Sequence, residues 1–274
     1  MGSSRGVRAT QIVAALLCLS SAAQFAGALA GKGVPPNAVQ VTIWSIGALT
    51  LCVVHAGLTK GWRRALGFSV LSSVISWAVE FVGCNYGWWF GDYGYTEALG
   101  LAIGNVPILV VVSWEIIIYP SLLLVDRFGS AGVVGTGFAR VVRIAFASFA
   151  TALVATTWDT MTDPISVHAG YWAWDHGGEY ASDLAGGIPY SNFGGWVGAV
   201  FLISFLYRVL ADRAPVAATA APSPWFATWL FTSLFLGSLA GLFTYGFHGI
   251  AFIGCFTMGP IVVLAWTTAL SPQK

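Results

Sequence analysis

Four acidic residues lie within or beside apolar stretches, where an ionisable side chain is costly and is by default a candidate for function. Glu80 and Glu115 lie inside two of these stretches, and Asp159 and Asp163 follow a third. Asp159 and Asp163 are four positions apart, so they share one face of a helix if the helix extends that far. A carboxyl group removed from water keeps its proton more readily and can then act as a general acid.

Aromatic residues accompany these acids along the chain, namely Trp88, Trp89, Tyr95, Trp158, Trp172 and Trp196, with Asn192 just before the last. A belt of rings at the membrane interface accounts for about half of the aromatic residues in this part of the chain. The others suit a carbocation reaction, in which an acid protonates an alkene and ring faces stabilise the cation. The catalytic candidates are therefore Asp159, Asp163 and Glu80, and the aromatic residues, Asn192 and Glu115 are substrate-binding candidates.

Each acid also has a purely structural interpretation. Glu80 could be an interfacial acid in contact with water, and Glu115 could form a hydrogen bond between helices. Asp159 and Asp163 could be solvated at a helix end or cap the turn at Pro164. For the proton donor, Asp159 or Asp163 is favoured over Glu80, and Glu115 is favoured least because it lies deepest in its stretch.

Other kinds of chemistry have less support. His168 and His176 share a segment with three aspartates, but no spacing typical of a metal site is present, so no metal is expected. His55 and His248 are interpreted as packing residues, and the four cysteines as buried apolar ones. No lysine lies inside an apolar stretch, which excludes a retinal Schiff base, and no glycine-rich nucleotide motif occurs.

The composition shows what kind of scaffold must position these residues. Of the 274 residues, 57% are hydrophobic and only 8% are charged, whereas a soluble domain carries about 25% charged residues. A soluble enzyme and a nucleic-acid-binding protein are excluded, and the net charge of +1 indicates no electrostatic partner. The chain is predicted to be a single all-α membrane domain over residues 1–274, a polytopic helix bundle in the lipid bilayer.

Eight apolar stretches are long enough, or nearly so, to cross a bilayer, at residues 10–30, 38–58, 66–85, 99–125, 141–158, 193–210, 225–243 and 247–269. The segment 1–30 could instead be a signal peptide, because basic residues precede its apolar run and Ala28–Ala30 resembles a cleavage site. A retained first helix is favoured because the run is long for a signal sequence. Cleavage would leave seven helices.

The loops predict the orientation. Eleven of the 12 basic residues fall on one side if eight helices alternate, and Lys32 falls on the other. Basic loops stay in the cytoplasm, so both termini are expected to be cytoplasmic in a cell-membrane protein. Two loops rich in acidic and aromatic residues, 86–98 and 159–192, are expected outside, whereas 214–224 is a plain inner linker.

The two outer loops resemble each other, which indicates an internal repeat. At an offset of 83 residues Glu80 falls on Asp163 and Asp92 on Asp175, and at an offset of 82 Pro107 falls on Pro189 and Trp114 on Trp196. The third and fourth helices and the fifth and sixth helices are therefore predicted to be two parallel copies of one unit. Pro107 is expected to kink the fourth helix.

Taken together, these motifs resemble a known family. The pattern comprises Glu80, Gly87–Tyr95, Asn105–Pro107 and Trp114–Glu115, then Trp158–Asp159, Asp163–Pro164, Trp172–Trp174 and Gly187–Trp196. It is similar to the integral membrane hydratases of carotenoid biosynthesis, over roughly residues 40–265. The resemblance implies that water is added, without a cofactor, to the terminal isopropylidene double bond of a linear carotenoid, giving a tertiary alcohol. It also implies a membrane carotenoid as substrate and other enzymes of the carotenoid pathway as partners.

Two other functions fit parts of the sequence. Asp159 and Asp163 form an Asp-x-x-x-Asp pattern that could bind a magnesium diphosphate, as in a membrane prenyltransferase, but a second aspartate-rich motif is missing. A transporter or a non-catalytic membrane module could use Glu80 and Glu115 as relay or binding acids. Dependence on Mg²⁺ would favour the first function, and no change in carotenoid products would favour the second.

Overall fold

A computed structural model describes residues 2–129, 137–213 and 223–271. Most of the predicted linker 214–224, residues 130–136 and Lys274 lie outside the described residues. The long helices are α1 (Gly2–Leu29), α2 (Ala38–Lys60), α3 (Trp62–Tyr86), α4 (Ile108–Phe128), α5 (Gly137–His168), α7 (Tyr190–Arg213) and α8 (Trp225–Thr244). Two shorter helices, α9 (His248–Thr257) and α10 (Gly259–Leu270), follow them.

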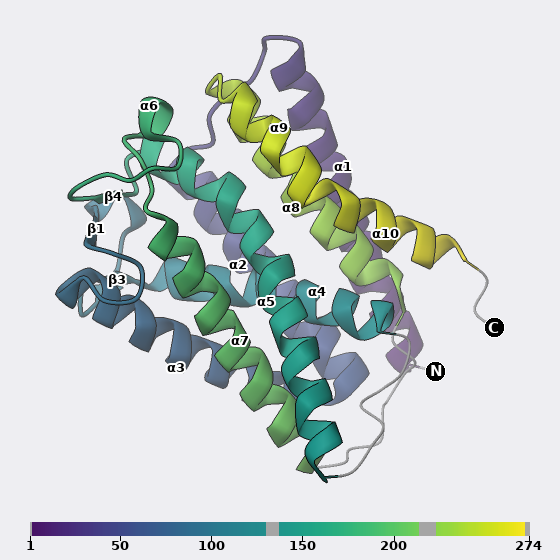
Figure 1. Cartoon of the computed structure of the whole chain (residues 1–274). Helices are drawn as coiled ribbons and strands as arrows, with labels where there is room; N and C mark the ends of the chain where they lie inside the picture. Colours follow the sequence, from purple (N-terminus) through teal and green to yellow (C-terminus); the bar gives the residue numbers. More distant parts are fainter. Residues whose placement is uncertain (1, 130–136, 214–222, 272–274) are drawn as a thin grey trace.

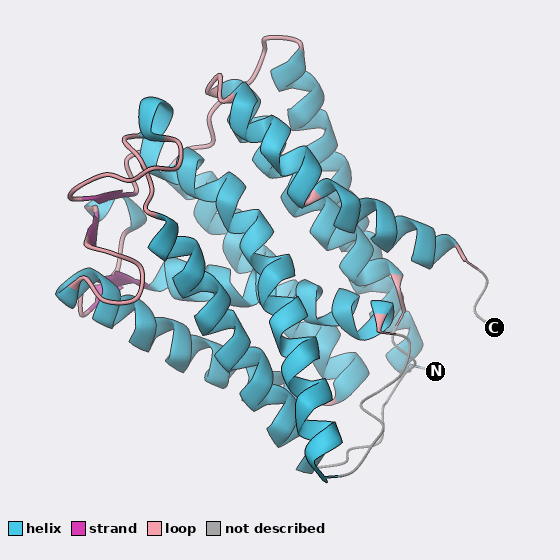
Figure 2. Ribbon diagram, in the orientation of Figure 1, coloured by secondary structure: helices cyan, strands magenta, loops and turns pink. Residues whose placement is uncertain are grey.

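The protein is a polytopic helical membrane bundle, as the composition predicts (Figures 1 and 2). Within the described ranges, seven helices are long and apolar enough to cross a bilayer. Helices α9 and α10 are bent by 40° at their junction, and they make an eighth span if the pair is taken as one. The predicted eight spans are therefore reached, with the first helix included, when the α9–α10 pair is counted as one span.

The connections contain a little regular structure at one end of the bundle (Figure 1). Strand β1 (Tyr93–Tyr95) pairs with β4 (Trp172–Trp174), and β2 (Ala102–Ile103) pairs with β3 (Val106–Pro107). Two short helices complete this end, η1 (Glu97–Leu99) and α6 (Ser182–Ala185). The predicted outer loops are thus joined to each other through the β1–β4 pair.

Helix α5 is longer than predicted, since it continues to His168 instead of ending at residue 158. Pro164 lies inside the helix and leaves the carbonyl of Thr160 without its usual backbone donor. The Tyr180 hydroxyl donates to that carbonyl at 2.9 Å, which compensates for the missing bond. The predicted loop 159–192 is therefore too long, and Asp159 and Asp163 lie inside a helix rather than at its solvated end.

Helix α4 is shorter than predicted, because residues 99–107 form the β2–β3 hairpin and its approach. The predicted kink at Pro107 is wrong, since Pro107 is the N-cap of α4 and the proline inside the helix is Pro120. A proline is well tolerated just before or at a helix start, where its missing N–H is not needed. The helix thus presents its first turns, rather than its middle, to the paired loops.

Helices α3, α4, α5 and α7 pack together beneath the β1–β4 pair (Figure 1). Helix α3 contacts α4 and α7, and α5 contacts α7 and α4. Helix α1 packs along α8, where Ser21 and Ser233 hydrogen bond at 2.9 Å, and α9 and α10 pack on α8 as well. The four-helix group is the part of the bundle that can hold a site between the two paired loops.

Backbone turns of similar conformation fit the predicted repeat. Each copy has a turn with two consecutive left-handed residues, Gly104–Asn105 and Gly186–Gly187, followed by a proline and the start of a helix. In the β1–β4 pair the central partners are Gly94 and Ala173, which are 79 residues apart. The helices that lead into these strands end at left-handed glycines, Gly87 after α3 and Gly170 after α5, which are 83 residues apart. This spacing fits the predicted offset of 83, which matches Glu80 to Asp163, and the strands differ in offset because the connection from α5 to β4 is shorter than that from α3 to β1.

Basic residues form ion pairs and hydrogen bonds at the other ends of these helices. Arg208 of α7 forms an ion pair with Asp126 of α4, and Lys60 Nζ of α2 lies 3.9 Å from the same carboxylate. Arg127 donates to the backbone carbonyls of Pro224 and Ala265, at the start of α8 and in α10. The end opposite the β1–β4 pair is therefore stabilised by charged groups that three helices share.

Candidate functional site

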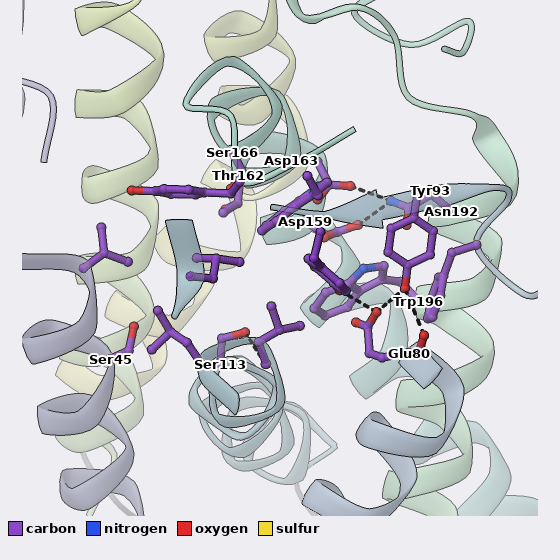
Figure 3. A pocket seen from close by; sticks show the side chains of 18 of the residues that line it. Ser45, Glu80, Tyr93, Ser113, Asp159, Thr162, Asp163, Ser166, Asn192 and Trp196 are labelled. Carbon is purple, nitrogen blue, oxygen red and sulfur yellow. Dashed lines mark hydrogen bonds between the residues drawn. The ribbon is translucent and has the colours of Figure 1, made fainter. Parts of the chain in front are cut away.

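A cavity of about 170 Å³ lies beneath the paired loops, between α2, α3, α4, α5 and α7 (Figure 3). Glu80, Asp159 and Asp163 all line it, so the structure brings the three predicted catalytic acids to one place. Asn192, Tyr95, Trp158, Trp172 and Trp196 also line the cavity. None of its lining residues is a lysine, an arginine or a histidine.

Asp159 and Asp163 form a close pair on one face of α5, because they lie one helical turn apart. Both are buried, with 2% and 4% of their surface exposed. The amide Nδ2 of Asn192, in the first turn of α7, donates to Asp159 at 3.1 Å and to Asp163 at 2.5 Å (Figure 3). The two carboxyls are also within hydrogen-bonding reach of each other. Two adjacent carboxyls cannot both be ionised in such a site, so the pair retains a proton.

Glu80 has a different environment, although it lines the same cavity. Its Oε2 accepts hydrogen bonds from the hydroxyls of Tyr93 and Tyr95, the latter at 2.6 Å, and its Oε1 accepts one from Trp114 Nε1 at 3.0 Å. An ionised carboxylate only accepts hydrogen bonds, and donors of this kind stabilise it most strongly. The three donors therefore favour the ionised form of Glu80, although its burial opposes that form, whereas the aspartate pair favours retaining a proton.

Tyr93 and Tyr95 are arranged by β1. Residues two apart in a strand point to the same side, so both hydroxyls reach Glu80. Burial and the nearby charge of Glu80 raise the pKa of both phenols well above the ordinary value. They remain hydrogen-bond donors at neutral pH. Tyr93 is not among the predicted site residues, although the alternation Tyr93-Gly94-Tyr95 places it on the same side as Tyr95.

Aromatic rings form much of the remaining wall. Trp196 stacks on Trp114 with ring centroids 4.1 Å apart, and Trp158 meets Trp196 edge-on at 6.3 Å. Trp172 packs edge-on against Tyr95 at 5.9 Å. Lining residues that the sequence analysis did not select include Val41, Trp44, Ser45, Phe90, Leu109, Ser113, Thr162, Ser166 and Trp174. Only their place in the fold identifies them.

The prediction that Trp88 and Trp89 line the cavity is wrong. Trp88 is 69% exposed and Trp89 is 47% exposed, and neither lines the cavity. Trp89 instead lies against the outside of α7, where its Nε1 donates to the carbonyl of Gly195 at 2.8 Å. A turn with left-handed backbone at Gly87, Trp89 and Gly91 directs this segment outward. The belt interpretation therefore suits these two rings better than substrate binding does.

Glu115 is also separate from the cavity. It is buried in α4, where its Oε1 accepts a hydrogen bond from Ser69 of α3 at 3.0 Å, which fits the alternative of a contact between helices. His55 hydrogen bonds to Tyr119 at 2.8 Å and stacks on Phe226, as a packing histidine would. His168 packs on Tyr245, away from the aspartates. Among the described residues no three metal-binding side chains are grouped as a metal would require.

Comparison with known proteins gives one curated relative, the bisanhydrobacterioruberin hydratase of Haloarcula japonica. It is 28% identical to this chain over 154 residues, which are 56% of this chain and 47% of the relative. The match therefore spans about half the length of that protein. No solved structure matches the chain significantly. The family described as "Carotenoid biosynthesis protein" matches residues 38–261, a range that includes every residue of the cavity. The chain belongs to this family of carotenoid biosynthesis proteins.

Proposed function

We propose that this protein is a carotenoid hydratase, which adds water to the terminal isopropylidene double bond of a linear carotenoid. The family and the hydratase activity for which the Haloarcula relative is named support this activity. The single observation that carries the proposal is the Asp159–Asp163 pair, held together by Asn192 in a cavity with aromatic walls. It supplies a proton at a place where a cation can be stabilised.

The first chemical step is transfer of the proton of the aspartate pair to the less substituted carbon of the alkene. The π electrons form the new C–H bond and leave a tertiary cation on the carbon that bears two methyl groups. The ring faces of Trp158 and Trp196 and the anionic Glu80 stabilise this charge. The Asn192 amide holds the two carboxyl groups close together, so that the pair can lose and regain one proton.

Water completes the reaction. Its oxygen forms the C–O bond with the cation, and the proton that it releases returns to the aspartate pair. The product is a tertiary alcohol and the acid is regenerated. The addition is redox-neutral, so the chemistry needs no electron-carrying cofactor. A substrate that resides in the membrane explains why the site lies inside a helical bundle.

The residues around the cavity favour this reaction over prenyl transfer. A diphosphate group carries several negative charges, which need cationic side chains or metal ions close by. The lining of the cavity has three acids and no basic residue. The Asn192 amide, moreover, already occupies an oxygen of each aspartate. An uncharged alkene suits such a lining better than a diphosphate does.

The basic residues also support an orientation for the site. Lys60, Arg127 and Arg208 lie at helix ends opposite the cavity, and basic loops stay cytoplasmic. The cavity would then face the outer side of the cell membrane, with both termini in the cytoplasm. Water is the only second substrate, so an outer site has the reactant that it needs.

Expression in a host that accumulates lycopene tests the proposal. The extracted pigments are separated, and their masses are measured by mass spectrometry. We expect a product that is heavier by one water and carries the hydroxyl at the chain end. The Asp159→Asn/Asp163→Asn double variant is the matched control, because it keeps the shape of the pair and removes its proton. Equal pigments from the wild type, this variant and the empty host would contradict the hydratase function.

A further inference from the structure

The cavity has an apolar arm that leads away from the carboxyls. Three residues of α2 line it, Val41, Trp44 and Ser45, which lie on one helix face because they are three and four positions apart. The first turns of α4 form the adjoining wall, through Leu109, Val110 and Ser113. Figure 3 shows Ser45 on the side of the cavity remote from Glu80, with Ser113 between them.

Exposure changes along the cavity. At the acid end, Glu80, Asp163 and Asn192 are buried, and the adjoining rings of Trp158 and Trp172 are half-buried. At the other end, Val41, Trp44 and Leu109 are only half-buried. Beside them, Val39 and Ile43 of α2 are 66% and 67% exposed, on a surface that faces hydrocarbon in a membrane-spanning helix. The carboxyl groups are therefore enclosed, whereas the end of the cavity at α2 adjoins an exposed apolar surface near the start of α4.

The volume limits what part of a carotenoid can occupy the cavity. Ligand pockets that enclose a whole small molecule measure roughly 300–1,000 Å³, whereas this cavity measures about 170 Å³. A linear carotenoid is about as long as the hydrocarbon core is thick, ~30 Å. Only the end group fits beside the aspartates, and the rest of the chain has to pass through the opening.

We infer that the polyene enters sideways from the bilayer, between the outer half of α2 and the first turns of α4. This inference rests on the proposed function and specifies how its substrate binds. The end group reaches Asp159 and Asp163, and the chain lies along Val41 and Trp44 and continues into the lipid. The indole face of Trp44 offers a flat surface to a planar polyene. A substrate with one long apolar tail and one reactive end is the class that this shape accepts.

Val41→Trp tests the opening, because a large ring at this position fills the gap beside Leu109. Val39→Trp is the matched control, since the same substitution two residues earlier falls on the exposed face of α2. Each variant is purified and assayed with lycopene and with an acyclic monoterpene hydrocarbon that has the same isopropylidene end. The monoterpene is short enough to reach the acids without a tail in the opening.

We expect Val41→Trp to lower kcat/KM for lycopene by about tenfold or more and to leave the monoterpene rate within about twofold of wild type. Val39→Trp should change neither. Equal lycopene rates for the two variants, or an equal loss with both substrates in Val41→Trp, would overturn the inference. If the wild type hydrates neither substrate, the proposed hydratase function is rejected. The proposed opening is then tested by measuring how much lycopene copurifies with each variant. Val41→Trp should then retain about tenfold less pigment than Val39→Trp, and equal retention would overturn the inference.

Discussion

Trp114 and Trp196 stack face to face across the bundle, with ring centroids 4.1 Å apart and planes inclined by only 3°. They occupy equivalent positions in the two copies of the repeat, in the second turns of α4 and α7. Their roles nevertheless differ. Trp114 is fully buried and donates to Glu80, whereas Trp196 lines the cavity. A symmetric pair of rings thus positions one acid on one side and forms the wall for substrate on the other.

The same divergence affects the acids. The predicted repeat matches Glu80 to Asp163, yet Glu80 is surrounded by three donors and Asp163 faces a second carboxyl. Matching positions of the predicted repeat can therefore place two carboxyl groups in different surroundings. Because the surroundings of these carboxyl groups differ, substitutions at the aspartate pair and at the donors to Glu80 should have different effects on activity and stability.

Removing the proton of the aspartate pair should stop hydration. Asp163→Asn keeps the shape of the side chain but removes the acid, and loss of general acid catalysis typically lowers the rate about 10²–10⁴-fold. Asp159→Asn should behave similarly because the two carboxyls share one proton. The measurement is alcohol formed per amount of folded protein, with folding checked by size-exclusion chromatography.

Two controls make that result specific. Asp175→Asn changes an exposed loop aspartate outside the cavity, and Glu115→Gln changes a carboxyl that contacts Ser69 instead of the cavity. Both variants should keep most of their turnover. If both aspartate variants form alcohol at the wild-type rate while Glu115→Gln forms none, the chemistry lies deeper in the bundle than proposed.

The phenols on Glu80 predict how stability depends on alkaline pH. Burial and the charge of Glu80 raise the pKa of Tyr93 and Tyr95 in the folded protein. Below about pH 10 the phenols keep their protons in both the folded and the unfolded state, so they cause no change. Above it, only the unfolded phenols lose protons, and the free energy of unfolding falls by about 1.4 kcal/mol per pH unit for each group.

Thermal unfolding in detergent between pH 8 and 11 measures this dependence. In Tyr95→Phe one of the two phenols is absent, so stability should fall less steeply above pH 10 than in the wild type. At pH 8 the same variant should be less stable by about 1.5–3 kcal/mol, the typical contribution of a hydrogen bond to a charged group. An identical alkaline slope in both proteins would show that Tyr95 ionises as freely when folded as when unfolded.

Much of the fold follows from the sequence because the bilayer imposes simple demands. Long apolar stretches predict the helices, and the scarcity of charge makes Glu80, Asp159 and Asp163 conspicuous. The extension of α5 past Pro164 could not be predicted in this way. It depends on the hydroxyl of Tyr180, which comes from a loop 16 residues beyond the proline and replaces the missing backbone donor.

The details of the site depend on backbone turns that have weak sequence signals. Trp88 and Trp89 are aromatic and next to the acids in sequence, but a left-handed conformation at Trp89 itself turns them away from the cavity. No sequence motif indicates the arm of the cavity along α2, since Val41 and Trp44 are ordinary residues for an apolar helix. Only the three-dimensional arrangement separates substrate-facing rings from those in the interface belt.

The close contact between α7 and the turn before β1 can be tested with neighbouring glycines. A Cβ at Gly195 would lie 2.6 Å from Phe90 Cδ1 and 2.7 Å from the carbonyl oxygen of Trp89. Gly195→Ala should therefore destabilise the protein by roughly 1–3 kcal/mol. It should also slow hydration, because Asn192 is one turn away on the same helix. Thermal unfolding and alcohol yield report the two effects.

Gly194→Ala is the matched control for this contact. The adjacent glycine has open space where its Cβ would be, and alanine favours a helix interior by up to about 1 kcal/mol over glycine. This variant should be as stable as the wild type or slightly more stable. Equal unfolding temperatures for the two alanine variants would mean that α7 and the turn at Phe90 adapt to each other without cost.

The orientation of the site can be tested from two exposed positions at opposite ends of the bundle. Glu97 lies in the loops at the β1–β4 end of the bundle, and Arg63 lies at the start of α3, next to the basic group at Lys60. In a background without native cysteines, which is needed because Cys255 is exposed, a single cysteine replaces either residue. Basic segments remain in the cytoplasm, so an impermeant maleimide should label Glu97→Cys in intact cells. It should label Arg63→Cys only after the membrane is opened. The opposite pattern would put the aspartate pair on the cytoplasmic side, and water and carotenoid would then have to meet there.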